Sequence, residues 1–176
     1  MSVTIAESGM SFGPYPDDDC FQIEKSQLYA RIKTGVQMAE FAVIRRRPAK
    51  PVTIFLIEAK SSAPNPGNLQ STKDFQNYIA EIHQKMHNGL QVLFSAWLAR
   101  HPEAQAELPP GFHAVRFDAL PIECVLVING HQKAWLPPVQ DALKRSLGLV
   151  IKTLGLPANG ISVINDVMAK KYGLIS

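Results

Sequence analysis

Three charged residues lie near the ends of two apolar runs, at a spacing that suits hydrolytic chemistry. The segment 38–57 holds the two runs, which are rich in Val, Ile and Phe, as strands are. A basic, proline-containing stretch between the runs predicts a β-hairpin with its turn centred on Ala49. The numbers of paired residues then sum to 98, so Glu40 lies opposite Glu58. Lys60 shares the face of Glu58, because side chains along a strand alternate between the two faces.

Two carboxylates on opposed strand positions need a counter-charge. Directly opposed side chains have Cβ atoms about 4.5–5.5 Å apart, and carboxylates that close repel each other unless a cation lies between them. Mg²⁺ suits this position, because it prefers oxygen ligands and keeps several of its waters. Lys60 would then lie beside the metal, near an attacking water or a scissile phosphate. The residues therefore indicate a metal site with an adjacent lysine.

Glu40 followed by Glu58-Ala59-Lys60 resembles the PD-(D/E)xK motif of the restriction-endonuclease-like nucleases. In that motif an acidic residue on one strand precedes a Glu-x-Lys triplet at the end of a buried central strand, and the apolar run 54–57 fits such a strand. The family usually has Asp, often after Pro, where this chain has Glu40 after Ala39. The resemblance follows the order of elements over residues 15–130.

The resemblance implies a fold, a cofactor and a partner. The implied fold is a single mixed α/β domain over residues 1–176, with a restriction-endonuclease-like αβββαβ core in which helices flank a central mixed sheet, and with an extra C-terminal helix and strand. Mg²⁺ or Mn²⁺ is the implied cofactor, with Glu40 and Glu58 as ligands and Lys60 orienting or helping to deprotonate the water. DNA is the implied partner, and a homodimer is common among such enzymes.

Glu24 is a third candidate metal ligand. Acidic residues 17–19 precede an apolar-periodic run, which predicts a helix over residues 21–32. Glu24 is three residues after Phe21 and four before Leu28, so it would point toward the apolar face of that helix. In many enzymes of the resembled family, the helix before the hairpin contributes an acidic residue to the metal site. The alternative is a partly exposed Glu24 that pairs with a polar neighbour: Lys25, Gln27 or Arg31.

Four cations gather at the predicted hairpin turn: Arg45, Arg46, Arg47 and Lys50. They could hold the backbone phosphates of a nucleic acid. Alternatively, they are solvated charges that keep a hairpin tip from aggregating. Arg46 is an even number of positions from Glu40, so an unbroken strand would place Arg46 on the face of the carboxylates, near the cleavage site.

Hydrophobic periodicity predicts the remaining elements. The longest is a helix from Ser71 or Thr72 to Arg100, although Gly89 costs it about 1 kcal/mol relative to Ala. The polar side of this helix carries Lys73, His83, Lys85 and His87. Strands are predicted at 3–5, 113–117, 122–130 and 161–165, helices at 139–154 and 166–172, and turns or loops at 11–16 and 61–68.

Composition narrows the class of protein. A chain of 176 residues suits one domain, and 46% hydrophobic with 19% charged residues is ordinary for a globular protein. The net charge of +3 does not by itself demand a nucleic-acid partner. No secretory signal opens the sequence and no apolar stretch is long enough to span a membrane, so we expect a cytoplasmic protein. Cys20 and Cys124 have no metal-like spacing and are expected to be small buried thiols.

Two functions from different classes fit these features. The first is a metal-dependent nuclease that acts on DNA, which the retained Glu58 and Lys60 favour. The second is a catalytically inactive restriction-endonuclease-like fold that binds nucleic acid or supports an assembly, which the absence of the usual Pro and Asp favours. An unrelated α/β protein with a chance motif is a third interpretation. The third interpretation is tested by whether Glu40, Glu58 and Lys60 meet around one pocket, and a nuclease assay with several divalent metals and DNA forms is the most informative experiment.

Overall fold

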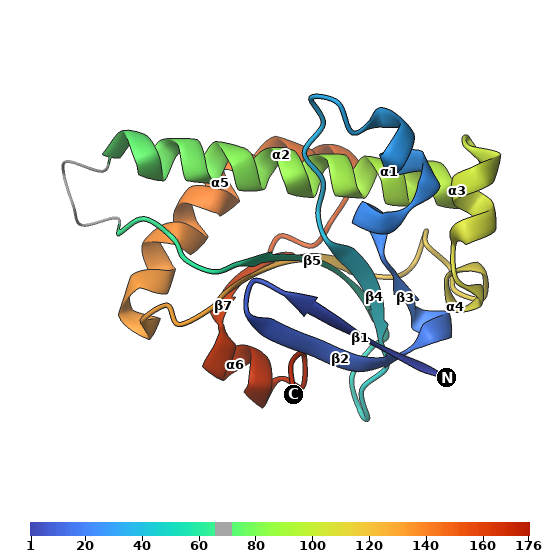
Figure 1. Cartoon of the computed structure of the whole chain (residues 1–176), viewed down its shortest axis with the longest axis horizontal. Coiled ribbons are helices and arrows are strands. Elements are labelled where there is room, and N and C mark those ends of the chain that lie inside the picture. The colour runs from blue at the N-terminus through green and yellow to red at the C-terminus, as the bar shows by residue number, and fades with distance from the viewer. Residues whose placement is uncertain (66–71) are drawn as a thin grey trace.

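The computed structural model describes residues 1–65 and 72–176. Over these residues, five strands form one mixed sheet in the order β3-β4-β5-β6-β7 (Figure 1). The strands are β3 (Cys20–Phe21), β4 (Phe41–Arg45), β5 (Thr53–Lys60), β6 (Ile122–Ile128) and β7 (Ile161–Asn165). Neighbours from β3 to β5 run antiparallel, whereas β5, β6 and β7 run parallel. The carboxyl ends of β5, β6 and β7 therefore lie along the same edge of the sheet.

Helices cover one face of this sheet and a second, two-stranded hairpin covers the other (Figure 1). The helical layer consists mainly of α2 (Thr72–Trp97) and α5 (Leu136–Leu154), with the shorter α1 (Gln27–Ile32), α3 (Pro102–Glu107) and α4 (Pro110–His113). The opposite layer holds β1 (Ser2–Glu7), β2 (Met10–Pro16) and α6 (Asp166–Lys171). The described residues thus form three layers with the mixed sheet in the middle.

Alternation along β4 and β5 divides their side chains between two hydrophobic cores. One core, between the sheet and the helices, takes Ala42, Ile44, Ile54 and Leu56. The other core, between the sheet and β1–β2, takes Phe41, Val43, Phe55 and Ile57. Apolar burial stabilises both layers, and strands buried on both faces read as continuous apolar runs rather than as alternating ones.

Several predictions from the sequence are confirmed. Phe41 pairs with Ile57 and Arg45 with Thr53, so paired numbers in the hairpin sum to 98 as predicted. The predicted long helix is α2, and the predicted strands at 122–130 and 161–165 are β6 and β7. Gly155 ends α5 in the left-handed conformation, with φ of 63°. The predicted fold class, a mixed α/β protein whose mixed sheet is flanked by helices, is also confirmed.

The helix predicted over residues 21–32 is wrong in its first half. Phe21 pairs with Ala42 in the sheet, so backbone pairing takes the residues that periodicity assigned to a helix. A single 3-10 turn, η2 (Ile23–Lys25), follows, and α1 begins only at Gln27. The side chain of Ser26 accepts a hydrogen bond from Tyr29 N and caps that helix.

Two other predictions are wrong. The segment 11–16, predicted as a turn, lies within β2, where buried Phe12 and Tyr15 pack against the sheet. The strand predicted at 113–117 is absent from the described residues, because Pro110 opens the short helix α4, which ends at His113. Residues 66–68 of the predicted loop and the helix start proposed at Ser71 lie outside the described residues.

Cys20 and Cys124 are buried free thiols, as predicted. Burial raises the pKa of each thiol to about 12, so neither is a nucleophile at neutral pH. None of the helices in the described segments has the length and apolar character that crossing a bilayer requires.

Candidate active site

The candidate site lies at the edge where the parallel strands end. β5 ends at Lys60, which pairs with Ile128 at the end of β6. β4 runs in the opposite direction, so its first residues come to the same edge, and Glu40 immediately precedes them. Open α/β sheets commonly bind ligands beyond the carboxyl ends of their parallel strands. The motif residues are therefore at a position that suits a functional site.

Glu40 directly precedes β4, and Glu58 directly follows Ile57, which pairs with Phe41. Glu40 N donates a hydrogen bond of 3.1 Å to Ile57 O, so the backbone of Glu40 is held at the end of the β4–β5 pairing. Both carboxyl groups lie on the helical face of the sheet, where each is within ion-pair distance of Lys85 of α2. Glu58 has no solvent exposure and Glu40 is 8% exposed. The two carboxyl groups thus share Lys85 as an ionic partner, although the strand pairing itself stops at Phe41 and Ile57.

Lys60 lies on the same face and is held between two carboxylates. Its Nζ lies 3.4 Å from Glu58 Oε1 and 2.5 Å from Oε1 of Glu81 on α2. Glu81 is partly exposed, so the outer side of this lysine faces toward solvent. The predicted association of Lys60 with Glu58 is thus present, and α2 adds an acidic partner that the motif does not include.

Lys85 of α2 was not predicted as a site residue, yet it lies at the centre of the cluster. Its Nζ lies 2.9 Å from Glu58 Oε1 and 3.5 Å from Glu40 Oε1. The side chain of Lys85 is only 15% exposed, whereas the sequence placed it on the polar side of the helix. The sequence feature that could have identified Lys85 is its position, immediately before Met86 and three residues after Ile82. Both of these neighbours are buried. That position is the margin of the apolar stripe, from which a long side chain can reach inward.

Gly89 explains how Lys85 reaches the sheet. A Cβ atom at Gly89 would lie 2.9 Å from the Cβ of Ala39 and 3.2 Å from two methyl carbons of Leu56. The helix can approach the start of β4 this closely only because residue 89 lacks a side chain. The glycine that weakens the helix as an isolated element therefore allows α2 to bring Lys85, one turn earlier, onto Glu40 and Glu58.

Glu24 also reaches the site, although through η2 rather than through the predicted helix. Its backbone N donates to Glu40 O at 3.2 Å, and its carboxyl group shares a hydrogen bond with the carboxyl group of Glu40. Arg31, one of the alternative partners considered for Glu24, instead forms an ion pair with Glu103 of α3. Three acidic side chains, Glu24, Glu40 and Glu58, thus follow one another across the site.

Burial and mutual repulsion alter the protonation of the two central carboxyl groups. Burial, the hydrogen bond with Glu24 and the charge of Glu58 raise the pKa of Glu40 to about 9. Burial raises the pKa of Glu58 to about 7, although Lys85 and Lys60 counteract that shift. Burial opposes the charge of Lys85, but Glu58, Glu40 and Glu24 together outweigh it and raise its pKa. At neutral pH, Glu40 is therefore protonated and Lys85 is charged.

The site contains buried polar atoms that lack hydrogen-bond partners among the described residues: both carboxylate oxygens of Glu58 and the hydroxyl of Tyr78. The Lys85 and Lys60 ammonium groups lie at ion-pair distance from Glu58 Oε1 without making a hydrogen bond of good geometry to it. Burial and the nearby charges of Glu58 and Glu81 raise the pKa of Tyr78. Buried polar atoms are rarely left without a partner, so Glu58 has the capacity to bind a further group.

The donor set fits a divalent cation only in part. Carboxylate oxygens are suitable ligands for Mg²⁺ or Mn²⁺, and Mg²⁺ often takes only one or two of them. Among residues 1–65 and 72–176, however, no group of three or more His, Cys, Asp and Glu side chains is arranged to hold a metal ion. Glu40 and Glu58 could serve as a two-carboxylate site, and the ammonium of Lys85 would have to move away from them.

The basic hairpin tip lies at the opposite end of the strands from the carboxylates. Arg46 is six residues from Glu40, which corresponds to about 20 Å along an extended strand. β4 ends at Arg45, and Arg46 forms an ion pair with Asp19, with its Nε 3.1 Å from Oδ2. Strand length therefore separates Arg46 from Glu40 and Glu58, and Asp19 is its partner in the structure.

The other cations of the tip have partners of their own or lie in solvent. The Arg45 guanidinium lies 5.7 Å from the centroid of the Tyr15 ring and donates to Tyr172 O at 3.1 Å. The Arg47 guanidinium lies 5.3 Å from the centroid of the Phe55 ring. Lys50 is exposed at the turn. Of the four cations, Lys50 is therefore the most accessible to a phosphate.

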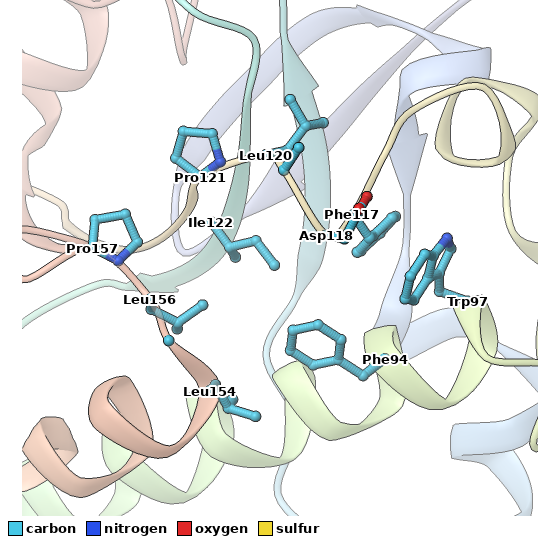
Figure 2. A pocket seen from close by; sticks show the side chains of 12 residues that line it. Phe94, Trp97, Phe117, Asp118, Leu120, Pro121, Ile122, Leu154, Leu156 and Pro157 are labelled. Carbon is cyan, nitrogen blue, oxygen red and sulfur yellow. The ribbon is translucent and has the colours of Figure 1, made fainter.

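A cavity of about 460 Å³ lies at the other end of β6, near Ile122 (Figure 2). Figure 2 shows the aromatic side chains of Phe94, Trp97 and Phe117 along one side of this cavity. Among its lining residues, Asp118 has the one titratable side chain, and that carboxylate forms an exposed ion pair with Arg116. Four further cavities of 320–660 Å³ within the described residues are likewise lined without Glu40, Glu58 or Lys60. These five cavities therefore lie apart from the charged cluster.

No protein-family model, curated protein or solved structure matches this chain.

Proposed function

We propose that this protein is a metal-dependent nuclease that hydrolyses phosphodiester bonds in DNA, similar to enzymes of the PD-(D/E)xK type. The observation that carries the proposal is that Glu40 and Glu58 share Lys85 as an ionic partner, with Lys60 beside Glu58, at the edge where the parallel strands end. A chance Glu-x-Lys triplet gives no reason for a second acidic residue so close to it. It also gives no reason for the full burial of Glu58.

The arrangement of the elements supports a restriction-endonuclease-like core. The antiparallel hairpin of β4 and β5 leads through the crossover helix α2 to β6, which is parallel to β5. This order corresponds to the second half of the αβββαβ pattern. β3 supplies the remaining strand but has only two residues, and α1 follows it instead of preceding all three strands. The proposed core is thus well supported from β4 onward and less regular before it.

Mg²⁺ or Mn²⁺ would be held by Glu40 and Glu58, with Glu24 as a third acidic residue beside Glu40. When bound, such an ion polarises a phosphoryl oxygen and acidifies a bound water. Oε2 of Glu58 supports this assignment: it is a buried acceptor without a hydrogen bond among the described residues, whereas Lys85 and Lys60 both lie beside Oε1. The near-neutral pKa of Glu58 also allows a cation to replace its proton at modest cost.

Lys60 would stabilise negative charge on the phosphate as it develops. A fixed positive charge aimed at the reacting group is worth more in a partly buried site than in water. Glu58 and Glu81 hold the ammonium of Lys60 from two sides, so its position is set before a substrate arrives. When a phosphate binds, the ion pair between Lys60 and the partly exposed Glu81 would break, and the phosphate would replace Glu81 as a partner of Lys60.

DNA would extend from the carboxylates toward the hairpin tip. Arg45, Arg46, Arg47 and Lys50 lie about 20 Å from Glu40 by strand length, so they would contact phosphates several base pairs from the scissile one. Lys50 suits this role best, because Arg46 pairs with Asp19 and Arg45 packs against Tyr15. A homodimer would allow two such sites to cut both strands.

A nuclease assay with matched variants tests the proposal. Purified wild type is incubated with supercoiled, linear duplex and single-stranded DNA, each with Mg²⁺, Mn²⁺, Ca²⁺ or a chelator. We expect cleavage with Mg²⁺ or Mn²⁺ that is lost in Glu58→Gln and Lys60→Met and retained in Lys73→Met, which alters an exposed lysine at the start of α2. Cleavage that survives in both Glu58→Gln and Lys60→Met would come from another site or a contaminant.

A catalytically inactive fold that binds nucleic acid or supports an assembly is the second candidate. The observation that favours it is Lys85, whose ammonium already compensates both Glu40 and Glu58. A site that has replaced its metal by a lysine needs no cofactor. In that case DNA binding would be the same with metal and with chelator, and no DNA form would be cleaved with any of the metals.

A further inference from the structure

The ammonium of Lys85 lies where a metal between the two carboxyl groups would lie. Its Nζ is 2.9 Å from Glu58 Oε1 and 3.5 Å from Glu40 Oε1, so both carboxyl groups share this one ammonium. Lys60, the lysine of the motif, approaches Glu58 from another side at 3.4 Å and pairs with Glu81. The two lysines therefore have different positions, and Lys85 is the one placed between the carboxyl groups.

The surroundings show that this position is built into the fold. Lys85 comes from α2, and the close approach of α2 at Gly89 fixes the distance from the helix to the start of β4. Glu58 is fully buried, so without a neighbouring cation its charge would lack compensation. At 15% exposure, the side chain of Lys85 still has a route to solvent. A lysine has a flexible four-carbon stem and a compact charge, so its ammonium can withdraw without movement of the backbone.

We infer that Lys85 is a built-in counter-cation of the Glu40–Glu58 pair, and that a divalent metal binds there only by displacing its ammonium. The inference rests on the proposed function in assuming that a metal uses this site. In the metal-free protein, Lys85 keeps the buried carboxyl groups compensated and the strands in register. On metal binding, the ammonium moves outward, because two cations of combined charge +3 cannot share one pair of carboxylates. Lys85 therefore lowers the metal affinity of the site and stabilises the apo protein.

Isothermal titration calorimetry of the full chain with Mn²⁺ and with Mg²⁺, without nucleic acid and at fixed pH and salt, tests this inference. Removal of a positive charge within a few ångströms of a bound dication should raise affinity strongly, by about tenfold or more. We therefore expect Lys85→Met and Lys85→Gln to bind Mn²⁺ at least that much more tightly than wild type. Lys85→Arg keeps the charge and should show no gain. Lys73→Met, on the exposed start of the same helix, should match wild type.

Thermal unfolding supplies the second measurement. Without metal, Lys85→Met should melt below wild type, because the carboxyl groups have lost their cation, and saturating Mn²⁺ should raise its melting temperature more than that of wild type. If the neutral variants fold only when Mn²⁺ is present, the inference is supported in the same way, since the metal then replaces the ammonium. Three results would overturn the inference: neutral variants that bind Mn²⁺ no better than wild type, neutral variants that bind no Mn²⁺, and neutral variants that stay unfolded even with Mn²⁺.

The outcomes separate this inference from the proposed function. If wild type cleaves DNA with Mn²⁺ and the Lys85 variants bind the metal no better, the inference fails and the nuclease stands. If the neutral variants bind Mn²⁺ tightly and wild type neither binds it nor cleaves DNA, the inference stands and the native protein is not a nuclease. Wild-type cleavage together with tighter binding in the neutral variants supports both.

Discussion

Glu40 and Glu58 adjoin Phe41 and Ile57, the last pair of the β4–β5 hairpin, and Lys85 Nζ lies 3.5 Å from the carboxyl group of Glu40 and 2.9 Å from that of Glu58. Few structural features constrain a site as strongly as two buried acids held in register by a hairpin. Because the two carboxyl groups are so close and so buried, protonation of either one changes the stability of the folded protein. Measurements of stability can therefore probe the candidate site before any substrate is known.

The stability of the protein should fall as pH rises from about 4.5 to 9 through the ionisation of Glu40. Its ordinary pKa is 4.5 and its folded pKa is about 9, so over this range the folded protein retains a proton that the unfolded chain has released. A raised carboxyl pKa gives stability that is complete below the unfolded value and lost as pH passes through the folded value. Glu58, with a folded pKa of about 7, adds to the effect in the lower part of the range.

Urea unfolding of wild type and Glu40→Gln at steps of pH measures this dependence. The variant cannot ionise at position 40, so the difference in unfolding free energy between the two proteins should change progressively from pH 5 to 9, to the disadvantage of wild type. The comparison removes the contributions of groups common to both proteins. A difference that stays constant with pH would show that Glu40 ionises normally in the folded state.

Glu24→Ala should lower the pKa of Glu40. The Glu24 carboxyl group raises that pKa both through a shared hydrogen bond and through its charge, and the substitution removes both contributions. Carbon-detected NMR titration of the glutamate side chains reports the pKa directly. The matched control is Lys25→Ala, which alters the exposed neighbour of Glu24 and should leave Glu40 unchanged. An unchanged Glu40 pKa in Glu24→Ala would separate Glu24 from the site.

Gly89→Ala should destabilise the protein by about 1–3 kcal/mol, because the added methyl group overpacks the contact between α2 and the start of β4. The ideal Cβ at this position lies 2.9 Å from Ala39 and 3.2 Å from Leu56. Gly148 in α5 is the matched control, since its Cβ would meet nothing within 4 Å. Gly148→Ala should therefore gain up to about 1 kcal/mol from helix propensity. Chemical unfolding checks both values, and equal effects would contradict the close approach at Gly89.

The sequence predicted the hairpin but not what α2 brings to it. Apolar strands of matched length and one turn were enough to pair Phe41 with Ile57 and so to bring Glu40 and Glu58 to the same end of the hairpin. Lys85 could not be assigned in the same way, because its position depends on how closely a distant helix docks. That approach is set by the long-range contact of Gly89 with Ala39 and Leu56, which no local pattern encodes.

Long-range pairing also explains the elements that local patterns misassigned. Phe21 has helical periodicity with Leu28, but its backbone pairs with Ala42 across the sheet. Phe12 and Tyr15 lie in a segment with turn residues, yet their burial against the second face of the sheet holds that segment as a strand. In both cases, tertiary burial outweighs a weak local preference.

The last prediction concerns the basic tip and the path of DNA. Lys50 is exposed at the turn, whereas Arg45 packs against Tyr15 and donates to Tyr172 O. Each phosphate contact contributes about −0.9 to the slope of log affinity against log salt on duplex DNA. If the tip holds DNA, Lys50→Ala should flatten that slope by about one unit and leave stability unchanged. Arg45→Ala should leave the slope unchanged and lower the unfolding free energy by about 1 kcal/mol through its lost hydrogen bond and ring contact.

The effect of Arg46→Ala on the salt slope should lie between the effects of Lys50→Ala and Arg45→Ala. Arg46 is 47% exposed, but the carboxylate of Asp19 already compensates its charge, so a phosphate must compete with that partner. Binding of a labelled duplex, measured by fluorescence anisotropy from 50 to 300 mM salt with Glu58→Gln as the parent to prevent any cleavage through the proposed site, yields the three slopes. The order Lys50, Arg46, Arg45 follows from how freely each cation can leave its protein contacts. If Lys50→Ala leaves the slope unchanged, or if all three substitutions change it equally, the tip is a solvated turn and DNA is bound by another surface.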